Sequence, residues 1–125
     1  MSYKMSYVDD GFILTFKGDV TIQELNQANS AIHQHPNFDI HRYQIVNFLD
    51  ADLSSVTEND GRIPAQLDSI AARKNENVNV AFVAQGAHTL RVVEGYLSAA
   101  QASNKKWKFR AFSTFVDALA WSKNK

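Results

Sequence analysis

The chain has 125 residues, 45% of them hydrophobic, which suits one domain over residues 1–125 rather than two. Basic and acidic residues both number 13, and a formal net charge of zero argues against a nucleic-acid-binding protein, whose phosphate contacts need a basic excess. Cysteine is absent, which excludes disulfides and thiolate metal sites, and no apolar run approaches the ~20 residues of a membrane span, so we expect a soluble, cytoplasmic protein.

The first third of the chain predicts a β-hairpin followed by a helix. Residues 3–8 and 12–17 are β-prone, and the Asp-Asp-Gly sequence between them is typical of a tight turn. Thr21 and Glu24 match the capping-box pattern, in which each side chain accepts a hydrogen bond from the other residue's backbone N–H. The helix then repeats apolar residues at helical spacing, at Ile22, Leu25, Ala28 and Ile32.

The middle of the chain predicts a buried strand, a polar loop and a second helix. The strand covers residues 43–49, and in the loop over residues 50–61 most of the apolar residues give way to acids, serines and glycine. Pro64 suits the first turn of the helix, which we expect to begin between residues 60 and 63 and to run to about residue 74. Its expected core-facing residues are Ile63, Leu67, Ile70 and Ala71.

The last third predicts two more strand–helix units. Residues 78–84 form a nearly continuous apolar run, as is typical of a strand covered on both faces, and a helix is expected over residues 88–102. A strand over residues 107–112 precedes a helix that begins at Thr114, where Asp117 repeats the capping pattern. The expected buried residues of these two helices are Leu90, Val93, Tyr96, Leu97, Ala100, Phe115, Leu119 and Trp121.

The predicted element order is ββαβαβαβα, which indicates an α/β domain with a mostly parallel sheet of about five strands and four helices. The first strand is expected to pair antiparallel with the second at one edge, and that open edge leaves room for a homodimer. Ligands of such sheets bind beyond the carboxyl ends of the strands, where the loop over residues 50–61 is the longest connection.

Five stretches of the sequence carry a family resemblance. They are FKGDVTIQEL at 16–25, HPNFD at 35–39, YQIVNFLDADL at 43–53, VNVAFVA at 78–84 and WKFRAFSTFVDALAW at 107–121. Together they span nearly the whole chain and resemble the SpoIIAA-like branch of the STAS domain superfamily, whose parent members are anti-sigma factor antagonists and whose fold is related to the Sec14 lipid-transfer group. The resemblance implies a mostly parallel (βα)n fold and a regulatory, protein-interaction role.

The resemblance also directs attention to a phosphorylation switch. In the antagonists, an Asp-Ser-Ser/Thr-Gly motif carries the hydroxyl residue that the anti-sigma kinase phosphorylates, but the matching residues 58–61 here read Glu-Asn-Asp-Gly. Asp60 stands near the position of the phosphorylated residue, where its carboxylate can cap the next helix or act as a fixed phosphate mimic. Ser54, Ser55 and Thr57 lie nearby, and phosphorylation of Ser54 or Ser55 would add a charge that blocks or creates a partner contact.

Other polar residues at this edge allow several interpretations. Asp50 and Asp52 follow the strand directly, where two carboxylates can act as an acid/base pair, hold a hard cation or simply be solvated. His88 begins a helix at the same edge and can face the crevice or cap the helix. The candidate partner- or ligand-binding residues are therefore Asp50, Asp52, Ser54, Ser55, Thr57, Asp60, Gly61 and His88.

The sequence predicts no catalytic residue, metal site or cofactor. His33, His35 and His41 cluster, but i, i+2 spacing points side chains to different faces of an element. No G-x-S-x-G, G-x-G-x-x-G or P-loop sequence is present. The local basic cluster is short and brackets the last strand, with further lysines near the end: Lys105, Lys106, Lys108, Arg110, Lys123 and Lys125.

Our leading expectation is a non-enzymatic interaction module that binds a protein partner through the loop over residues 50–61 and the helix over residues 62–74. The polar positions of that helix are Arg62, Gln66, Asp68, Ser69, Arg73 and Lys74. The alternative is a small binding protein for an apolar or lipid-like ligand, with a pocket near the same loop and His88 that Tyr96 and Trp121 could line.

The hypotheses predict different structures. An interaction module predicts an exposed apolar patch beside the loop and no cavity larger than a few waters. A ligand carrier predicts a closed apolar pocket of about 300 Å³ or more. An enzyme, our third hypothesis, predicts convergent ionisable groups with strongly perturbed pKa values.

Overall fold

The computed structural model, which describes residues 3–124, begins with a β-hairpin. Strand β1 (Tyr3–Val8) pairs antiparallel with β2 (Gly11–Asp19), as the sequence predicted. The turn between them holds Asp9 and Asp10 at φ angles of 48° and 69°. Asp tolerates this left-handed conformation better than most residues, because its short side chain can hydrogen-bond locally. The acids of the turn therefore close the hairpin.

Strands and helices alternate after the hairpin. They are α1 (Ile22–His33), β3 (Tyr43–Asp52), the 3-10 turn η1 (Glu58–Gly61), α2 (Arg62–Ala71), β4 (Asn79–Val83), α3 (Ala87–Ser103), β5 (Lys108–Phe112) and α4 (Phe115–Ser122). The strands lie in the sheet in chain order, and β2 to β5 run parallel. The α/β class, the order ββαβαβαβα and the antiparallel edge strand are confirmed.

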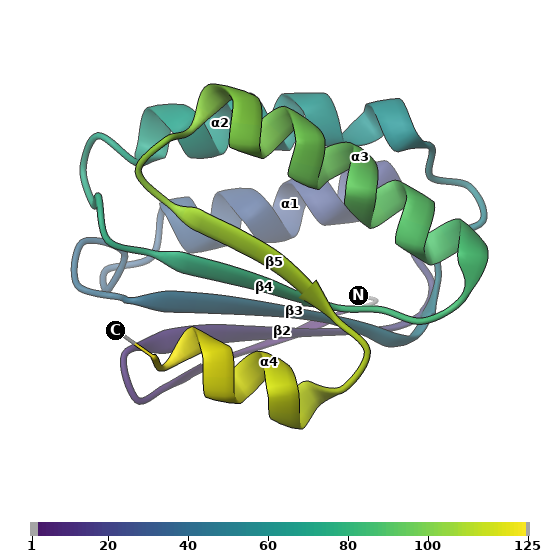
Figure 1. The fold of residues 1–125 in the computed structure, drawn as a ribbon, viewed down its shortest axis with the longest axis horizontal. Coiled ribbons are helices and arrows are strands. Elements are labelled where there is room, and N and C mark those ends of the chain that lie inside the picture. The colour runs from purple at the N-terminus through teal and green to yellow at the C-terminus, as the bar shows by residue number, and fades with distance from the viewer. Residues whose placement is uncertain (1–2, 125) are drawn as a thin grey trace.

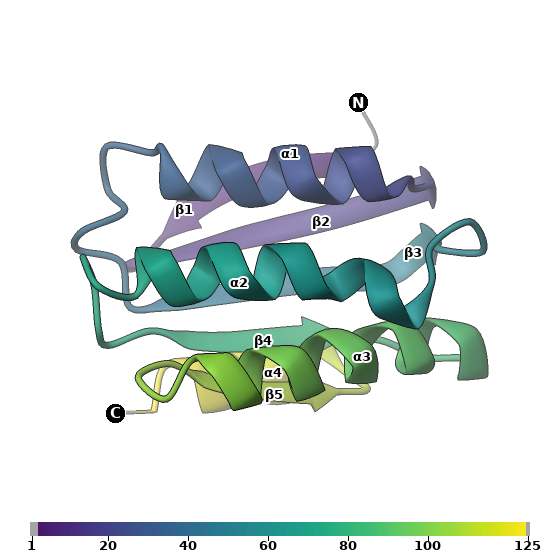
Figure 2. The same ribbon diagram turned by 90° about the horizontal axis from the view of Figure 1, so that it is seen from above.

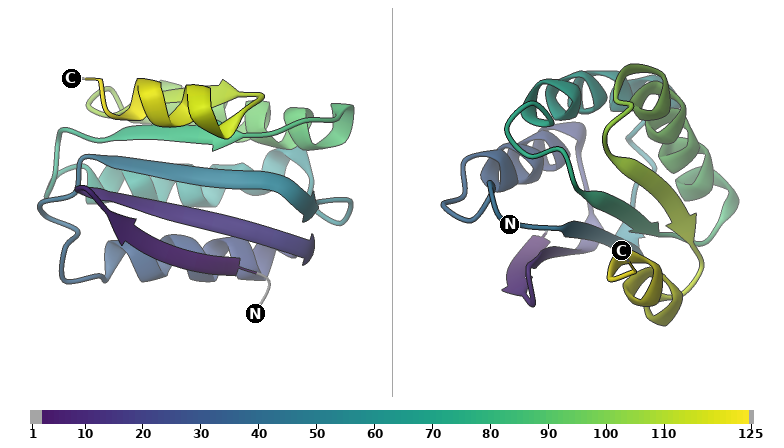
Figure 3. Two further views of the ribbon diagram at one scale, coloured as in Figure 1. Left: turned by 90° about the horizontal axis from the view of Figure 1, so that it is seen from below. Right: turned by 60° about the vertical axis from the view of Figure 1, so that its left-hand side comes forward.

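The helices are divided unequally between the two faces of the sheet. Helices α1, α2 and α3 cover one face and α4 lies on the other (Figure 1), and the three helices lie side by side over the strands when seen from above (Figure 2). Helix α4 contacts β3, β4 and β5, so β1 and most of β2 are left uncovered on that side, while Ile13 of β2 packs against the core under α4 (Figure 3, left). Strand β1 alternates accordingly, because Met5 and Tyr7 pack on the main core while Lys4 and Ser6 lie on the open side.

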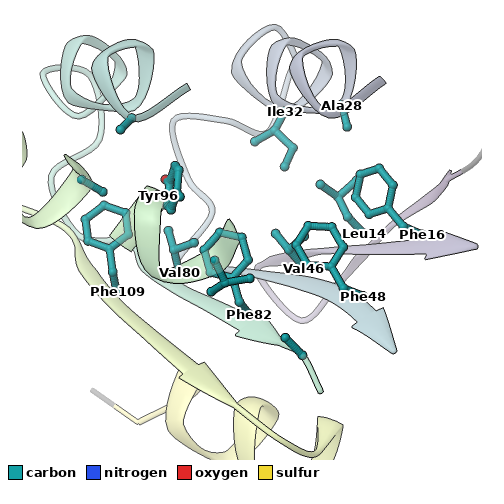
Figure 4. Close-up of a cluster of buried hydrophobic side chains, with 14 of the residues drawn as sticks. Leu14, Phe16, Ala28, Ile32, Val46, Phe48, Val80, Phe82, Tyr96 and Phe109 are labelled. Carbon is teal, nitrogen blue, oxygen red and sulfur yellow. The ribbon is translucent and has the colours of Figure 1, made fainter. Parts of the chain in front are cut away.

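The main core lies between the sheet and helices α1–α3 (Figure 4). Its strand residues alternate along each strand, so that every second side chain points toward the helices. They include Leu14, Phe16, Val46, Phe48, Val80, Phe82 and Phe109, which Ala28 and Ile32 of α1 and Tyr96 of α3 cover. The apolar stripe predicted for α1 is therefore confirmed.

A second, smaller core lies under α4. It joins Ala118 of the helix to Tyr43, Ile45, Ala81 and Val83 of the sheet, with Phe112, Phe115, Leu119 and Trp121 packed around them. Because Val80 and Phe82 point to the other face, β4 is apolar on both faces, as its continuous apolar run predicted.

Two of the sequence predictions about helix faces are wrong. Ile63, Leu67 and Ile70 of α2 are 61%, 41% and 56% exposed, although their spacing predicted the core. The face that α2 turns inward instead carries smaller side chains and one acid, at Ala65, Asp68 and Ala72. Leu90 of α3 is also 36% exposed, whereas Val93, Tyr96 and Ala100 are buried as predicted.

Candidate functional site

The loop after β3 is held by its own polar side chains. Strand β3 continues to Asp52, three residues beyond the predicted end, and Oδ1 of Asp52 accepts the backbone N–H of Ser54 at 2.9 Å. Hydrogen bonds from the hydroxyl and backbone N–H of Ser54 lower the pKa of the Asp52 carboxyl. Ser55 Oγ donates to the carbonyl of Val20 at 3.3 Å. These candidate residues therefore shape the turn.

His88 ties the start of α3 to the same loop. Its Nε2 donates to the carbonyls of Leu53 and Val56, at 2.9 and 3.0 Å. Leu53 and Val56 are themselves 1% exposed and belong to the main core. The imidazole of His88 is thus bonded to loop backbone, which favours a structural role for this residue over one in an open crevice.

The residues that match the phosphorylation motif pack tightly against α3. The N–H of Thr57 donates to Asp60 Oδ2 at 2.8 Å, so Asp60 is part of a capping box at η1. A Cβ at Gly61 would lie 2.8 Å from the Cα of Tyr96, and one at Gly95 would lie 2.3 Å from the carbonyl oxygen of Glu58. The retained glycine at position 61 therefore allows close packing, and the aspartate caps the turn.

The remaining candidate acid, Asp50, is exposed on β3. It pairs in register with Lys17 of β2, whereas Asp52 pairs with Asp19. Asn47 lies earlier on the same strand, and its Oδ1 accepts the backbone N–H of Leu49 at 3.0 Å. Within residues 3–124, no group of three or more histidine and acidic side chains is placed to hold a metal ion.

The outward face of α2 carries an apolar stripe, defined by Ile63, Leu67 and Ile70. Their spacing of four and three residues places them on one side of the helix, opposite the buried Ala65 and Asp68. Lys74 follows one turn later in the same direction, and one flank of the stripe carries basic and amide side chains at Arg62, Gln66 and Arg73, all exposed.

A polar cluster lies behind α2, where the sequence had predicted a solvent-facing acid. Asp68 is 2% exposed, and its Oδ1 lies 2.8 Å from Nε2 of His33 on α1. Its Oδ2 accepts the hydroxyl of Tyr96 on α3. Burial, reinforced by the nearby carboxylate, raises the pKa of the Tyr96 hydroxyl well above its ordinary value. Asp68 therefore links three helices, and its place in a stripe with Ala65 and Ala72 was the available sequence signal.

A cavity of about 80 Å³ lies between this cluster, α1 and the sheet. Its walls are largely apolar, with Asn29, Gln44, Asp68 and Tyr96 among the polar exceptions. Its volume is well below the 300–1,000 Å³ typical of ligand pockets. Trp121 packs under α4 on the other face of the sheet, so Tyr96 and Trp121 do not line a common pocket.

The other histidines have separate hydrogen-bond partners near the amino ends of the strands. His41 is 0% exposed, with Nδ1 2.5 Å from the carbonyl of Phe38 and Nε2 3.1 Å from the amide nitrogen of Gln44. Burial lowers the pKa of His41 to about 4. His35 Nδ1 accepts the N–H of Asn37 at 3.0 Å.

Comparison with known proteins found no family model that matches this chain and no matching curated protein. The STAS resemblance therefore stays a prediction, and the site is interpreted from its geometry. Within residues 3–124, no helix has the length and apolar character needed to cross a bilayer.

Proposed function

We propose that this protein is a cytoplasmic, non-enzymatic, STAS-like interaction module that docks a partner protein on α2, with η1 and the loop over residues 53–57 at its end. The observation that carries the proposal is the exposed apolar stripe of Ile63, Leu67 and Ile70. Large aliphatic side chains that are contiguous on one helix face mark an interaction site more often than scattered ones do.

The packing and hydrogen bonds that hold α2 against its neighbouring helices also favour docking. Gly61 and Gly95 allow α2 and η1 to pack closely on α3, and Asp68 links α2 to both neighbouring helices. His88 fixes the loop that precedes η1. A surface that is already ordered loses little conformational entropy when a partner binds, so more of the contact energy is available for affinity.

Charge on α2 indicates the chemistry of the partner. Three cations, Arg62, Arg73 and Lys74, lie beside or beyond the stripe, and residues 62–74 contain no exposed acid because Asp68 is buried. The complementary surface is a segment with apolar side chains flanked by acids. A second copy of this chain would instead bring one basic helix against another, which opposes self-association through this face.

The other hypotheses have less support. A cavity of about 80 Å³ is too small for a drug-sized or lipid-like ligand without movement of a helix. Hydrogen bonds within the fold occupy Asp52, Ser55 and His88, three of the candidate residues at the carboxyl edge. A phosphate on Ser54 would lie beside the carboxylate of Asp52, an unfavourable like-charge contact.

Photocrosslinking followed by a binding assay tests the proposal. A crosslinking amino acid at position 67 should capture a protein in the native host, and the same residue at position 116 should not. Val116 is 74% exposed and lies on α4, on the opposite face, so it is a matched apolar control. With the captured protein purified, Leu67→Asp should weaken the complex by about tenfold or more, while Val116→Asp leaves it unchanged.

Three outcomes would contradict the proposal. One is capture of the same protein at both positions. Another is a purified complex that survives Leu67→Asp with unchanged affinity. The third is capture of lipid alone at position 67, which would identify the stripe and its cations as a membrane-binding surface instead.

A further inference from the structure

Strand β1 has an open outer edge. It is the outermost strand at one end of the sheet, so among residues 3–124 it has β2 on one side and no strand on the other (Figure 3, left). All of its residues pair in register with β2, without a bulge, and none is a proline. Bulges and prolines are devices that prevent an edge from accepting another strand, so β1 is regular enough to be extended.

The hairpin turn determines which backbone groups of β1 face outward. A two-residue turn closes on a hydrogen-bonded pair, here Val8 and Gly11, and such pairs then alternate along the ladder. The carbonyl of Asp10 accepts the N–H of Arg42 on the β3 side at 2.6 Å, which agrees with this alternation. Every second residue of β1, counted from Val8, therefore bonds to β2. The residues between them direct their N–H and C=O groups away from the sheet, and they are Tyr3, Met5 and Tyr7.

These outward-facing groups are arranged symmetrically about Met5. Residues 3–7 read Tyr-Lys-Met-Ser-Tyr, which is nearly the same sequence in both directions. When a second copy of β1 runs antiparallel with its Met5 opposite the first, each Tyr3 lies opposite a Tyr7. All of these pairs join residues whose backbone groups face outward, and each pair exchanges two hydrogen bonds. The edge of β1 is therefore complementary to itself.

The side chains on the helix-facing side of β1 match in the same register. Tyr3 packs on Phe16 and Tyr7 packs on Phe12, with ring centroids 5.4 and 5.0 Å apart. Tyr3, Met5 and Tyr7 are only partly buried, so each has surface left to cover. Pairing places Tyr7 of the second copy beside Tyr3 of the first, and cross-strand aromatic pairs stabilise a sheet. One aromatic row would then join the two cores.

Charge does not oppose this pairing. Lys4 is the charged residue of β1, and it lies opposite the hydroxyl of Ser6 in the second copy rather than opposite another lysine. Like charges directly opposite each other would destabilise the pair. The chain also has a formal net charge of zero, so two copies do not repel each other at long range.

The other edge of the sheet is protected. Lys108 and Arg110 of the predicted basic cluster are exposed on β5, and the carbonyl of Phe109 accepts a hydrogen bond from Nε2 of Gln101 at 3.4 Å. Charged side chains on an edge strand oppose the addition of another strand. Lys125, the last residue of that cluster, lies outside the described residues. Pairing through β1 therefore closes at two copies and does not extend into a fibre.

We propose that β1 pairs with β1 of a second copy of this chain, antiparallel about Met5, and joins the two five-stranded sheets into one. This interface is separate from the α2 docking face and goes beyond the proposed interaction role. The two-fold axis is perpendicular to the sheet, so helices α1–α3 of both copies cover the same side (Figure 1). The dimer therefore presents two α2 stripes on one side, which suits a partner with two binding segments.

Sedimentation and amide hydrogen exchange test the dimer together. Between about 1 µM and about 1 mM protein, the sedimenting mass should rise from 14.0 kDa toward twice that value. Over the same range, hydrogen exchange at the N–H groups of Met5 and Tyr7 should become slower. The N–H of Ser6 is the internal control, because it bonds to β2 in either state and should stay protected throughout.

Charge at position 6 tests the pairing in both directions. Ser6→Lys brings a lysine opposite each Lys4 and should weaken the dimer by about tenfold, whereas Ser6→Glu should strengthen it. Arg110→Glu, on the opposite edge of the sheet, is the control and should leave the dissociation constant unchanged. Because the two substitutions at Ser6 act with opposite signs, a general loss of folding does not reproduce the pattern, and thermal unfolding of each variant checks this.

Introduced cysteines test the register, since this chain contains none. Lys4 and Ser6 of the second copy form a non-hydrogen-bonded pair whose Cα atoms lie about 4.5 Å apart, within the range of a disulfide. Lys4→Cys mixed with Ser6→Cys should therefore oxidise to a linked dimer. Either variant alone should link much less, because identical positions lie on the diagonal, about 7–8 Å apart.

Four results would overturn the proposal. A chain that stays monomeric at about 1 mM has no such interface. Equal weakening by Ser6→Lys and Arg110→Glu would show an effect of charge that is not specific to β1. Stronger linking by Ser6→Cys alone than by the mixture would exclude the register about Met5. Loss of the dimer in Leu67→Asp would place self-association on α2, whereas the β1 interface predicts that this variant still dimerises.

Discussion

His41 is buried as a neutral imidazole, because the hydrogen-bond partners of its two ring nitrogens fit only one proton on the ring. The carbonyl of Phe38 only accepts, so Nδ1 carries the proton, and the amide nitrogen of Gln44 donates, so Nε2 accepts. A second proton on Nε2 would turn an N–H toward another N–H. Desolvation opposes the charged form as well, and the pKa of His41 falls from its ordinary 6.5 to about 4.

This pKa difference predicts a pH-dependent stability. Between pH 4 and 6.5 the unfolded chain binds more protons at His41 than the folded one, so the free energy of unfolding rises with pH there. The contribution is complete above this window and decreases as pH falls through it, with about 2 kcal/mol lost by about pH 5. Urea unfolding at about pH 7 and about pH 5 measures the loss.

Histidine variants assign the effect to its source. His41→Gln should lower stability near neutral pH, because it disrupts the buried network, but it should shrink the difference between the two pH values. His35→Gln is the control and should retain the wild-type difference. An undiminished pH dependence in His41→Gln would show that other groups produce it.

At the residue scale, sequence predicted local interactions and missed distant ones. The roles of Thr21, Glu24 and Asp60 as caps were predictable because their partners lie three residues away. The burial of Asp68 was not, since its partners His33 and Tyr96 are 35 and 28 residues distant. An acid between apolar residues on a helix looks solvated until the fold supplies its donors.

At the element scale, α2 shows why a periodic pattern fixes a helix without fixing its orientation. The helix has two stripes. The large stripe consists of the bulky aliphatic side chains of Ile63 and Leu67, and the small stripe consists of the smaller side chains of Ala65 and Asp68. Hydrophobicity favoured burying the large stripe. Close approach to α3 at Gly61 requires small side chains at that contact, so the large stripe faces outward. Steric demands of a neighbouring element therefore decided the orientation.

The contact between α3 and η1 predicts that a glycine-to-alanine substitution inside a helix lowers the free energy of unfolding rather than raising it. Inside a helix, alanine is ordinarily about 1 kcal/mol more stabilising than glycine. In Gly95→Ala, however, the new Cβ would lie 2.3 Å from the backbone oxygen of Glu58, so the two elements must separate. We expect a loss of about 2–4 kcal/mol, measured by urea unfolding.

The adjacent position on α3 provides the control. Glu94 is exposed, and Glu94→Ala should change stability by no more than about 0.5 kcal/mol. If Gly95→Ala proves as stable as the wild type, then η1 can move away from α3 at little cost. The docking face would in that case be less rigid than its packing suggests.

At the scale of the whole molecule, the α/β class was predictable because element order alone restricts parallel sheets to few topologies. The side chosen by α4 was not predictable. The apolar run of β4 showed that both faces of the sheet are covered, but a pattern within a strand does not say which helix covers which face. The direction taken by the short connection between β5 and α4 determines which face α4 covers.

The second core predicts a sharp contrast between two neighbouring substitutions on α4. Ala118 is 0% exposed against Tyr43 and Val83, so Ala118→Asp buries an unpaired charge and should cost about 3 kcal/mol or more. Val116→Asp, at a position 74% exposed, should change stability by no more than about 0.5 kcal/mol. Equal urea midpoints for the two variants would show that α4 contributes little to the fold.

The agreement between strand order and chain order has a consequence for biosynthesis. Each strand pairs with the one made immediately before it, so a nascent chain leaving the ribosome can extend the sheet one unit at a time. No strand has to wait for a partner that is still untranslated. The hairpin is made before β3 and gives it an edge to join, and α4, made after β5, closes the face of the sheet that stays open until then.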